Sequence, residues 1–422
     1  MRSRLPLLVA IAIGAAALAG TGCSRRERAN PFDPHNPTTR GGPSGFMALA
    51  ANGRVNLRWD PVVGAGLQGF RLYRKTPADT AYVAISALLF PNRTQYSDLG
   101  LRNGLDHAYR LYFVLEGEGE TGPPAEDIAT PGPGRPWVAE AGGGRLLGLT
   151  PDGRHVAVQQ SGFSSPATVA VDSVSGRVWV SDSFAGRVAS LDPISGVLVS
   201  IPGLVSPGAM AAEPITHSAW VCDEQDGVVR EFSSTGSPLG APIEPVSTPI
   251  GIAIGAWDRS LWICERGADQ VRHYSSNLSL VGTIPIPAPS RVTTDSVAQR
   301  AWVTSFGNGR VYRIAPSGTK ELDLPGFQGP IGLAVDTRRG RVWVTEALGN
   351  RITVLDRQTG AVLFRVTGLS ETREVAVDPE TGEAWAVAPG SGQVVKISPA
   401  GTVLQRLGGL SQPFGIAFDP GR

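Results

Sequence analysis

Seven tryptophans recur at a nearly constant interval in this 422-residue chain. Neighbouring members are separated by 40 to 42 residues, and the set comprises Trp137, Trp179, Trp220, Trp262, Trp302, Trp343 and Trp385. Thirteen residues before the last six stand Pro166, Pro207, Pro249, Pro289, Pro330 and Thr372. A period of this length is typical of a repeat architecture, in which each unit buries its apolar face against the next.

Each interval holds four short apolar runs separated by turn residues. The first follows the proline position, as in Val169–Asp172 and Leu333–Asp336, and the second contains the tryptophan in Arg-Val-Trp-Val. A third run begins at Arg187, Arg310 or Arg351, and a fourth leads to the next proline position. Four short strands in about 41 residues are typical of the blade of a β-propeller.

The two ends of the repeat region each hold part of one unit. Trp137 lacks a strand thirteen residues upstream, whereas Pro413–Asp419 opens a repeat whose remainder is missing. We therefore predict that residues 413–420 supply the first strand, and residues 136–165 the other three, of one shared blade. Closing the ring would remove sheet edges that otherwise invite aggregation. The prediction is a seven-bladed β-propeller over residues 132–422.

The repeats resemble the NHL-repeat and YVTN-type propeller families. The resemblance rests on Pro-x-Gly-Ile-Ala-Val-Asp, Val-Trp-Val-Thr-Asp/Glu and Gly-Arg-Val, and it covers residues 136–422. It implies the fold and says little about function, because such rings host both binding proteins and enzymes.

Residues 44–131 form a separate unit of alternating apolar and polar strands. Three of these are expected at Arg54–Trp59, Gly69–Arg74 and His107–Val114, which predicts a β-sandwich. The unit resembles a fibronectin type III domain through Leu57-x-Trp59-x-Pro61 and through Tyr109 as a tyrosine-corner residue. The resemblance implies a spacer or a weak binding module. The whole chain is therefore predicted to be all-β.

The N-terminus has the features of an export signal over residues 1–22. Basic residues precede an apolar run from Leu5 to Leu18, which is short for a membrane span. Ala17-Leu18-Ala19 fits an ordinary signal-peptidase site, whereas Leu18 to Cys23 resembles a bacterial lipobox in which Cys23 is lipidated. An uncleaved anchor is a third alternative. Residues 23–43 are predicted to be a linker, and Ser24 after Cys23 favours the outer membrane by resemblance to known lipoproteins.

Charge and cysteine content narrow the function classes. Lys plus Arg number 38 against 37 for Asp plus Glu, so the net charge is +1, which argues against nucleic-acid binding through a broad basic face. Cys222 and Cys264 both lie two residues after a tryptophan, on neighbouring repeats. Equivalent positions on neighbouring blades lie about 10 Å apart, beyond disulfide reach, so we expect free buried thiols.

Charged residues recur at two fixed positions of the repeat, and we call the residues at one such position a column. An acid stands three residues after the tryptophan at Glu140, Asp182, Asp223, Glu265 and Glu346, and an arginine stands eight after it at Arg145, Arg187, Arg310 and Arg351. Both columns flank the turn between the second and third strands. Two interpretations remain open. Each acid caps its own turn and pairs with the arginine across it, or the acids form a charged rim that binds a ligand.

A residue that departs from the usual type at its repeat position is a better candidate for a binding site than a residue that recurs in most repeats. Two residues after the proline position the chain carries a small residue, except at Arg291 and Glu374, with Arg373 beside the latter. Phe184 and Phe306 lie in turns expected on the same face. We hypothesise that these five residues line a binding surface near the mouth of the central channel.

Catalysis is the alternative function. Related seven-bladed rings include a metal-dependent lyase that inactivates streptogramin antibiotics and the lyase that completes peptide amidation, and both need histidine and carboxylate clusters at the channel mouth. Here His155, His217 and His273 fall at different places in their repeats, so we predict no metal and no cofactor. The favoured function is an exported cell-envelope protein, lipid-anchored at Cys23, that binds a protein, peptide or glycan ligand. The alternative is a propeller lyase or hydrolase.

Overall fold

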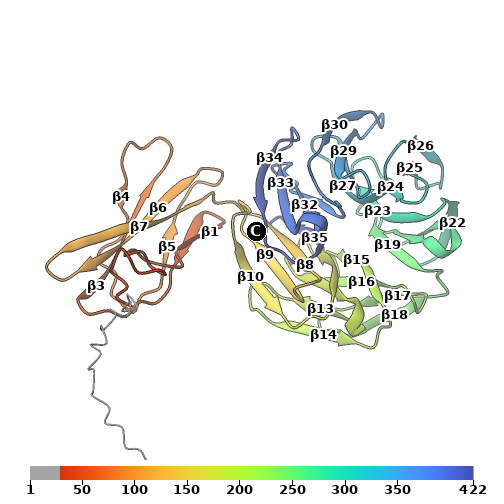
Figure 1. The fold of residues 1–422 in the computed structure, drawn as a ribbon. Helices are drawn as coiled ribbons and strands as arrows, with labels where there is room; N and C mark the ends of the chain where they lie inside the picture. Colours follow the sequence, from red (N-terminus) through yellow and green to blue (C-terminus); the bar gives the residue numbers. More distant parts are fainter. Residues whose placement is uncertain (1–28, 422) are drawn as a thin grey trace, which may run out of the picture.

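The computed structural model of the protein describes residues 29–421 and contains β-strands with only short 3-10 helices. Two units follow one another along the chain, an elongated two-sheet unit and a ring of radiating sheets (Figure 1). Within the described residues, no helix is long and apolar enough to serve as a membrane span.

The first unit consists of two antiparallel sheets packed face to face. One sheet has the order β1-β2-β5 and the other β4-β3-β6-β7. Their strands are β1 (Met47–Ala51), β2 (Arg54–Arg58), β3 (Leu67–Lys75), β4 (Val83–Ala84), β5 (Gln95–Leu99), β6 (His107–Leu115) and β7 (Gly119–Ala129). Trp59, Phe70 and Phe113 are buried between the sheets, because alternate residues of each strand point inward. Tyr109 is buried too, but its hydroxyl donates to the Asp98 carboxylate at 2.9 Å, whereas a tyrosine corner uses a backbone acceptor.

Residues 30–43 differ from the predicted linker. The Phe32 ring packs edge-on against Phe113 with centroids 5.0 Å apart, and the buried Asn36 side chain donates to the carbonyl of Asn30. This segment is therefore a strap on the first unit. The strap follows a single aromatic residue and local turns, so it has no periodicity that the sequence could reveal. Cys23 and the predicted signal lie outside the described residues.

From residue 135 onward the chain forms four-stranded antiparallel sheets, one for each tryptophan repeat. Consecutive strands make the sheets β11 to β14, β15 to β18, β19 to β22, β23 to β26, β27 to β30 and β31 to β34, and one further sheet has the order β10-β9-β8-β35.

The strands of the first part of this region are β8 (Arg135–Glu140), β9 (Arg145–Leu149), β10 (Val156–Ser161), β11 (Pro166–Val171), β12 (Val178–Asp182), β13 (Arg187–Leu191), β14 (Leu198–Pro202), β15 (Pro207–Glu213), β16 (Ser218–Asp223), β17 (Val228–Phe232), β18 (Pro238–Ile243), β19 (Pro249–Ile254), β20 (Leu261–Glu265), β21 (Gln270–Tyr274) and β22 (Leu280–Pro285). Those of the second part are β23 (Pro289–Asp295), β24 (Arg300–Ser305), β25 (Arg310–Ile314), β26 (Lys320–Pro325), β27 (Pro330–Asp336), β28 (Arg341–Glu346), β29 (Arg351–Asp356), β30 (Val362–Val366), β31 (Val375–Val377), β32 (Ala384–Ala388), β33 (Gln393–Ile397), β34 (Val403–Leu407) and β35 (Pro413–Asp419). Short 3-10 turns η1 (Ser183–Ala185), η2 (Arg266–Ala268) and η3 (Pro389–Ser391) follow β12, β20 and β32.

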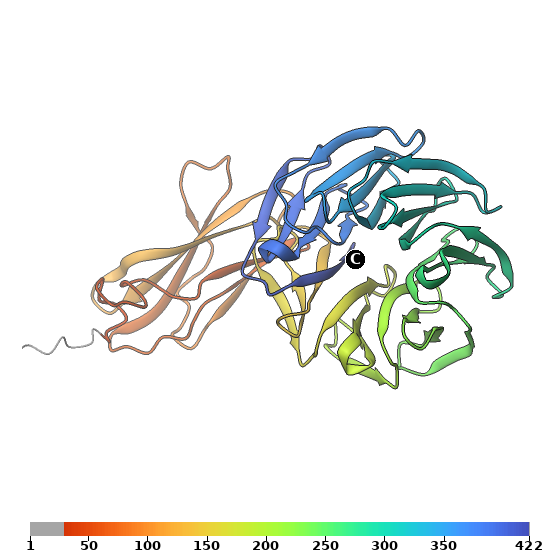
Figure 2. The same cartoon turned by 45° about the vertical axis from the view of Figure 1, so that its right-hand side comes forward.

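The first strands of these sheets form a closed circle. In the order β35, β11, β15, β19, β23, β27, β31, each strand contacts the next, and β31 contacts β35 again. The last strand, β35, pairs antiparallel with β8, placing Ala417 opposite Trp137, as the sequence predicted. Figures 1 and 2 show the sheets arranged around a central axis, with the C-terminal strand inside the ring. This arrangement is a β-propeller.

The repeated motifs have structural causes. Trp137, Trp179, Trp262, Trp302, Trp343 and Trp385 are fully buried between neighbouring sheets, and each such side chain removes roughly 200 Å² from water. In Gly-Arg-Val the glycine adopts a left-handed conformation, with φ +58° at Gly186, and a Cβ there would lie 2.4 Å from the Leu204 carbonyl oxygen. That carbonyl approaches because Leu204 donates its own N–H to Gly186 at 3.0 Å. Cys222 and Cys264 are buried free thiols, as predicted.

Polar contacts of two side chains, His155 and Asp152, join the propeller to the first unit. Nε2 of His155 lies 2.8 Å from Oδ2 of Asp127, and the N–H of Thr130 donates to the Asp152 carboxylate at 3.0 Å. His155 therefore serves the junction between the units and lies away from the channel mouth.

Candidate functional site

The five predicted acids are fully buried, each at the end of a second strand. Each accepts a hydrogen bond from a backbone N–H in the loop that enters its own sheet. The donors are Ser411 to Glu140, Ser164 and Ser165 to Asp182, Val205 and Ser206 to Asp223, Ser247 to Glu265, and Gln328 to Glu346. In four of the sheets the donor precedes the acid by 17 or 18 residues, but Ser411 follows Glu140 by 271 because that sheet joins both ends of the ring.

Arginines neutralise these buried acids. Arg145, Arg187 and Arg351 bond to Glu140, Asp182 and Glu346 across the turn, as the capping interpretation predicts. The capped segment differs from the prediction, because the backbone donors lie in the loop that enters the sheet and not in that turn. Asp223 and Glu265 pair instead with Arg230 and Arg272. The alternative interpretation of the five acids as a binding rim is wrong, because all five carboxylates are fully buried and each is paired with an arginine, which leaves them inaccessible to a ligand. They fasten the loops between sheets.

Arg310 and Phe184 also stand apart from a site. Ser305 replaces the acid opposite Arg310, so Arg310 pairs with Asp323 at 2.8 Å near the outer strands. Phe184 in η1 is 87% exposed and does not line the pocket at the channel mouth described below.

Arg291 and Glu374 come together across the central channel. Nε of Arg291 on β23 lies 2.8 Å from Oε1 of Glu374, which precedes β31. The corresponding positions on the other first strands are small: Thr168, Ala209, Gly251, Gly332 and Gly415. The ion pair therefore crosses the central channel at a level where the other first strands carry only small side chains. Below it lies a cavity of about 140 Å³, whose lining includes the ion pair itself, Thr168 and Thr293 together with the apolar residues Val169, Met210, Ile252, Val292, Leu333 and Ile416.

Arg291 is held rigidly. Its Nη1 donates to the carbonyls of Ile250 and Ser290, at 2.5 and 3.2 Å, while Nε is engaged by Glu374. Burial opposes the charge of Arg291, but the attraction of Glu374 outweighs it, and the pKa is raised above its ordinary value. Among the described residues, Nη2 has no hydrogen-bond partner.

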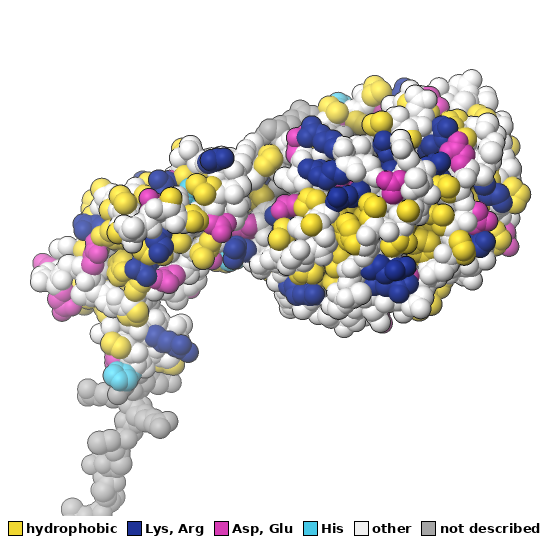
Figure 3. Space-filling view, turned by 90° about the horizontal axis from the view of Figure 1, so that it is seen from above, with side chains coloured by type: hydrophobic (Ala, Val, Ile, Leu, Met, Phe, Trp, Pro, Cys, Tyr) yellow, Lys and Arg dark blue, Asp and Glu magenta, His cyan; other side chains and the backbone are white. Residues whose placement is uncertain are grey.

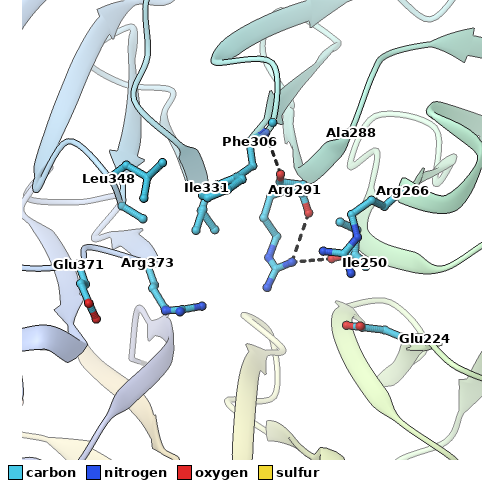
Figure 4. A pocket seen from close by; sticks show the side chains of 13 residues that line it. Glu224, Ile250, Arg266, Ala288, Arg291, Phe306, Ile331, Leu348, Glu371 and Arg373 are labelled. Carbon is cyan, nitrogen blue, oxygen red and sulfur yellow. Dashed lines mark hydrogen bonds between the residues drawn. The ribbon is translucent and has the colours of Figure 1, made fainter.

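Above the ion pair opens a pocket of about 530 Å³, which we call the mouth pocket (Figure 4). It is lined by Glu224, Ile250, Arg266, Ala288, Ser290, Arg291, Phe306, Gly307, Ile331, Ala347, Leu348, Glu371 and Arg373. Three of the five residues hypothesised from the sequence, Arg291, Arg373 and Phe306, lie here. Glu374 lies beneath, in the lining of the cavity of about 140 Å³.

The pocket walls combine apolar and charged groups. Figure 4 shows Ile331 beside Arg291 and Leu348 beyond it, with Arg266 and Glu224 on one side of Arg291 and Arg373 and Glu371 on the other. The Arg373 guanidinium lies 4.1 Å from the centre of the Phe414 ring, which steadies it over β35.

Four charged side chains of the pocket take part in none of the ion pairs of the described residues. Arg266, Arg373, Glu224 and Glu371 have no ion-pair partner within residues 29–421. Burial raises the pKa of Glu224 above its ordinary value, although Arg291 and Arg266 oppose this shift. The pocket therefore offers three guanidinium groups against two carboxylates, one of which is more readily protonated than usual.

Sequence reasoning missed Glu224, Arg266 and Leu348. They share one signal with Phe306, because all four lie one or two residues after the end of a second strand. An acid stands there before Glu224, Arg266 and Leu348, and Ser305 stands there before Phe306. Phe184 holds the same position on another blade but lies outside the pocket, so the signal does not distinguish the blades.

The histidines of the propeller have separate partners and do not form a cluster. Nδ1 of His217 lies 2.7 Å from the Asp172 carboxylate, and His273 stacks on Trp262 with ring centres 3.9 Å apart. In the described part of the chain, no three His, Cys, Asp or Glu residues are close enough together to hold a metal ion.

The fold is shared with several solved structures. A streptogramin B lyase is 20% identical with a TM-score of 0.53, over 60% of this chain and 86% of that one. Virginiamycin B lyase from Staphylococcus aureus is 16% identical with a TM-score of 0.52, over 59% and 87%. A functionally unknown protein from Desulfotomaculum acetoxidans is 16% identical with a TM-score of 0.59, over 68% and 99%.

The comparison decides the fold. The chain contains a β-propeller. At these identities the likeness extends to architecture and carries no activity with it. No protein-family model matches the sequence, and no curated protein matches it either.

Proposed function

We propose that this protein is an exported cell-envelope binding protein whose mouth pocket holds a protein, peptide or glycan ligand. In this proposal the propeller has seven blades of NHL-like repeats, and residues 44–131 are a fibronectin type III spacer. Lipidated Cys23 attaches the chain to the outer membrane. The observation that carries the proposal is a mouth pocket with apolar walls and charged side chains that remain unpaired within residues 29–421.

Apolar exposure at the mouth supports binding. Leu348 is 68% exposed and Phe306 is 40% exposed, and both line the same pocket. Exposed apolar groups that surround a concavity are typical of binding sites. A volume of about 530 Å³ is within the range of sites for small molecules or for the end of a peptide.

The surface charge supports a protein or small-molecule partner over nucleic acid. Acidic and basic side chains are interspersed on the face seen from above, and the basic groups border a hydrophobic area (Figure 3). Nucleic-acid binding through the phosphates needs a continuous basic surface.

A photo-crosslinker tests the binding proposal. We would place p-benzoylphenylalanine at Leu348 and, as a matched control, at Phe184, which is more exposed but lies outside the pocket. We expect crosslinks to one defined envelope component from position 348 and not from position 184. Equal labelling from both positions, or none from either, would contradict the proposal. The anchor is tested separately, because Cys23→Ala should move the protein from the membrane fraction to the soluble fraction.

The second candidate function is a propeller lyase or hydrolase, which the fold similarity to a streptogramin B lyase favours. The spread of the histidines counts against a site of that kind in this chain. Turnover of a crosslink-identified ligand by the purified protein would support the enzyme. Recovery of the ligand unchanged would support the binding protein.

A further inference from the structure

The floor of the mouth pocket consists of one guanidinium group that is already oriented. Three contacts, to Glu374 and to the carbonyls of Ile250 and Ser290, occupy Nε and Nη1 of Arg291. These contacts leave Nη2 without a partner among the described residues, and Arg291 lines both the mouth pocket and the cavity below it. A guanidinium fixed along one edge can donate along the other without losing further conformational freedom.

The carboxylate of Glu374 alone does not satisfy the hydrogen-bond donors of Arg291. Glu374 engages a single nitrogen of Arg291, whereas a guanidinium has five N–H donors. Arg266 and Arg373 add positive charge at the rim, and neither has an ion-pair partner within residues 29–421. An anionic group on the floor would therefore meet one oriented donor and two further cations, against the two carboxylates of the pocket, Glu224 and Glu371.

The wall beside Arg291 is apolar. Ile250, Ile331 and Leu348 line the pocket with Phe306, and Leu348 is largely exposed. A ligand whose anionic group lies on Arg291 would lay its remaining atoms against these side chains (Figure 4). Burial of an apolar body and a charge-assisted hydrogen bond then act on the same molecule.

We propose that the ligand of the mouth pocket carries a carboxylate on an apolar body, that Arg291 binds this carboxylate, and that Glu374 is the positioning residue for Arg291. This inference rests on the proposed function and names the ligand's chemical class. The carboxylate has two sources. The C-terminus of a peptide ending in an apolar residue is within the ligand classes of the proposed function, whereas a small aromatic or aliphatic acid would replace them.

Isothermal titration of the full chain with matched probes tests the inference. The first pair is 2-naphthoate and 2-naphthamide, and the second is acetyl-Ala-Leu with a free or an amidated C-terminus. We expect each carboxylate to bind roughly 10- to 100-fold more tightly than its amide, the range for a hydrogen bond between charged groups. Preference for the peptide over 2-naphthoate would identify a peptide C-terminus as the source, and the reverse preference a small acid.

Charge exchange shows whether Arg291 provides this preference. R291E/E374R keeps an ion pair across the channel but removes the oriented guanidinium, so we expect the carboxylate preference to disappear. The matched control is R310D/D323R, which exchanges a pair of the same 2.8 Å length outside the mouth pocket and should retain the preference. E374Q should weaken carboxylate binding and spare amide binding, because it loosens the guanidinium and leaves the apolar wall intact.

Several results would overturn the inference. Wild-type protein that binds acid and amide equally, or binds neither, contradicts it without the need for any variant. So does R291E/E374R that retains both the preference and the melting temperature. If that variant fails to fold, R291K replaces it, since lysine cannot hold Glu374 and two carbonyls while donating to a ligand. A specific crosslink at Leu348 combined with failure of all carboxylate probes would refute the ligand class and leave the binding function intact.

Discussion

Removing the buried carboxylate of Glu346 should destabilise the propeller without changing ligand binding. The side chain is fully buried and accepts the Gln328 N–H at 2.7 Å, two hydrogen bonds from Arg351 and one from Thr353. Glu346→Ala leaves the N–H and the hydroxyl unsatisfied and Arg351 unpaired.

The magnitude follows from these groups. Each unsatisfied buried donor costs about 1–3 kcal/mol, and breaking a buried ion pair about 3–5 kcal/mol in total. Arg351 is 22% exposed and can regain water, so we expect the loss to lie near 3 kcal/mol. For a unit of this size, roughly 2 °C of melting temperature corresponds to 1 kcal/mol, which predicts a decrease of about 6 °C.

Tryptophan fluorescence during thermal unfolding measures this effect, because six tryptophans are fully buried in the propeller. Glu140→Ala should cost at least as much as Glu346→Ala, since Glu140 bonds the Ser411 N–H next to the closing strand. The control is Glu380→Ala, which removes an exposed acid paired with exposed Arg338 and should shift the melting temperature by less than about 1 °C. An unchanged melting temperature for Glu346→Ala, together with weaker binding of a pocket ligand, would refute the structural role assigned to the acids.

The remaining predictions concern acid stability, the ring interior and the first unit. Although burial alone raises the pKa of Glu346, the bonds from Arg351 and Thr353 outweigh it and lower the pKa below the usual value. The stabilisation by the Glu346 carboxylate is therefore complete above the unfolded pKa of about 4.3 and is lost as pH falls through the lowered folded value. Between pH 7 and pH 3 the melting temperature should fall less in Glu346→Gln than in wild type. Gly415→Ala should destabilise the propeller by about 1–3 kcal/mol, since its Cβ would lie 2.5 Å from the Ala167 carbonyl oxygen. The control Gly282→Ala, whose Cβ would have nothing within 4 Å, should not destabilise it. Equal unfolding midpoints of the two variants in urea would contradict the prediction. Tyr109→Phe should cost about 1–2 kcal/mol by leaving the Asp98 carboxylate one donor short, measured as unfolding of the first unit, and no change would show that this bond contributes nothing.

The repeat architecture could be predicted from the sequence because it depends on periodic burial. The tryptophan spacing identified the sheets, and the incomplete repeats at both ends predicted the pairing of β35 with β8. The strap over residues 30–43 was mistaken for a linker, because the Phe32 contact with Phe113 depends on two residues far apart in the sequence.

The site was only partly predictable. Arg291 and Glu374 were found because they interrupt a column of small residues, and the pocket they adjoin also contains Arg373 and Phe306. For the five acids the sequence left a structural and a binding interpretation open, because their backbone N–H partners leave no mark in the sequence. Arg266 and Glu224 follow that same column, but only the curvature of the ring brings them to one pocket.

A crystal structure of the protein with 2-naphthoate tests the central claim most directly. The account predicts the carboxylate within hydrogen-bond distance of Nη2 of Arg291 and the naphthyl rings against Ile331 and Leu348. The claim would be contradicted by naphthoate bound instead in the cavity of about 290 Å³ between the two units, beside Arg54 and Arg135.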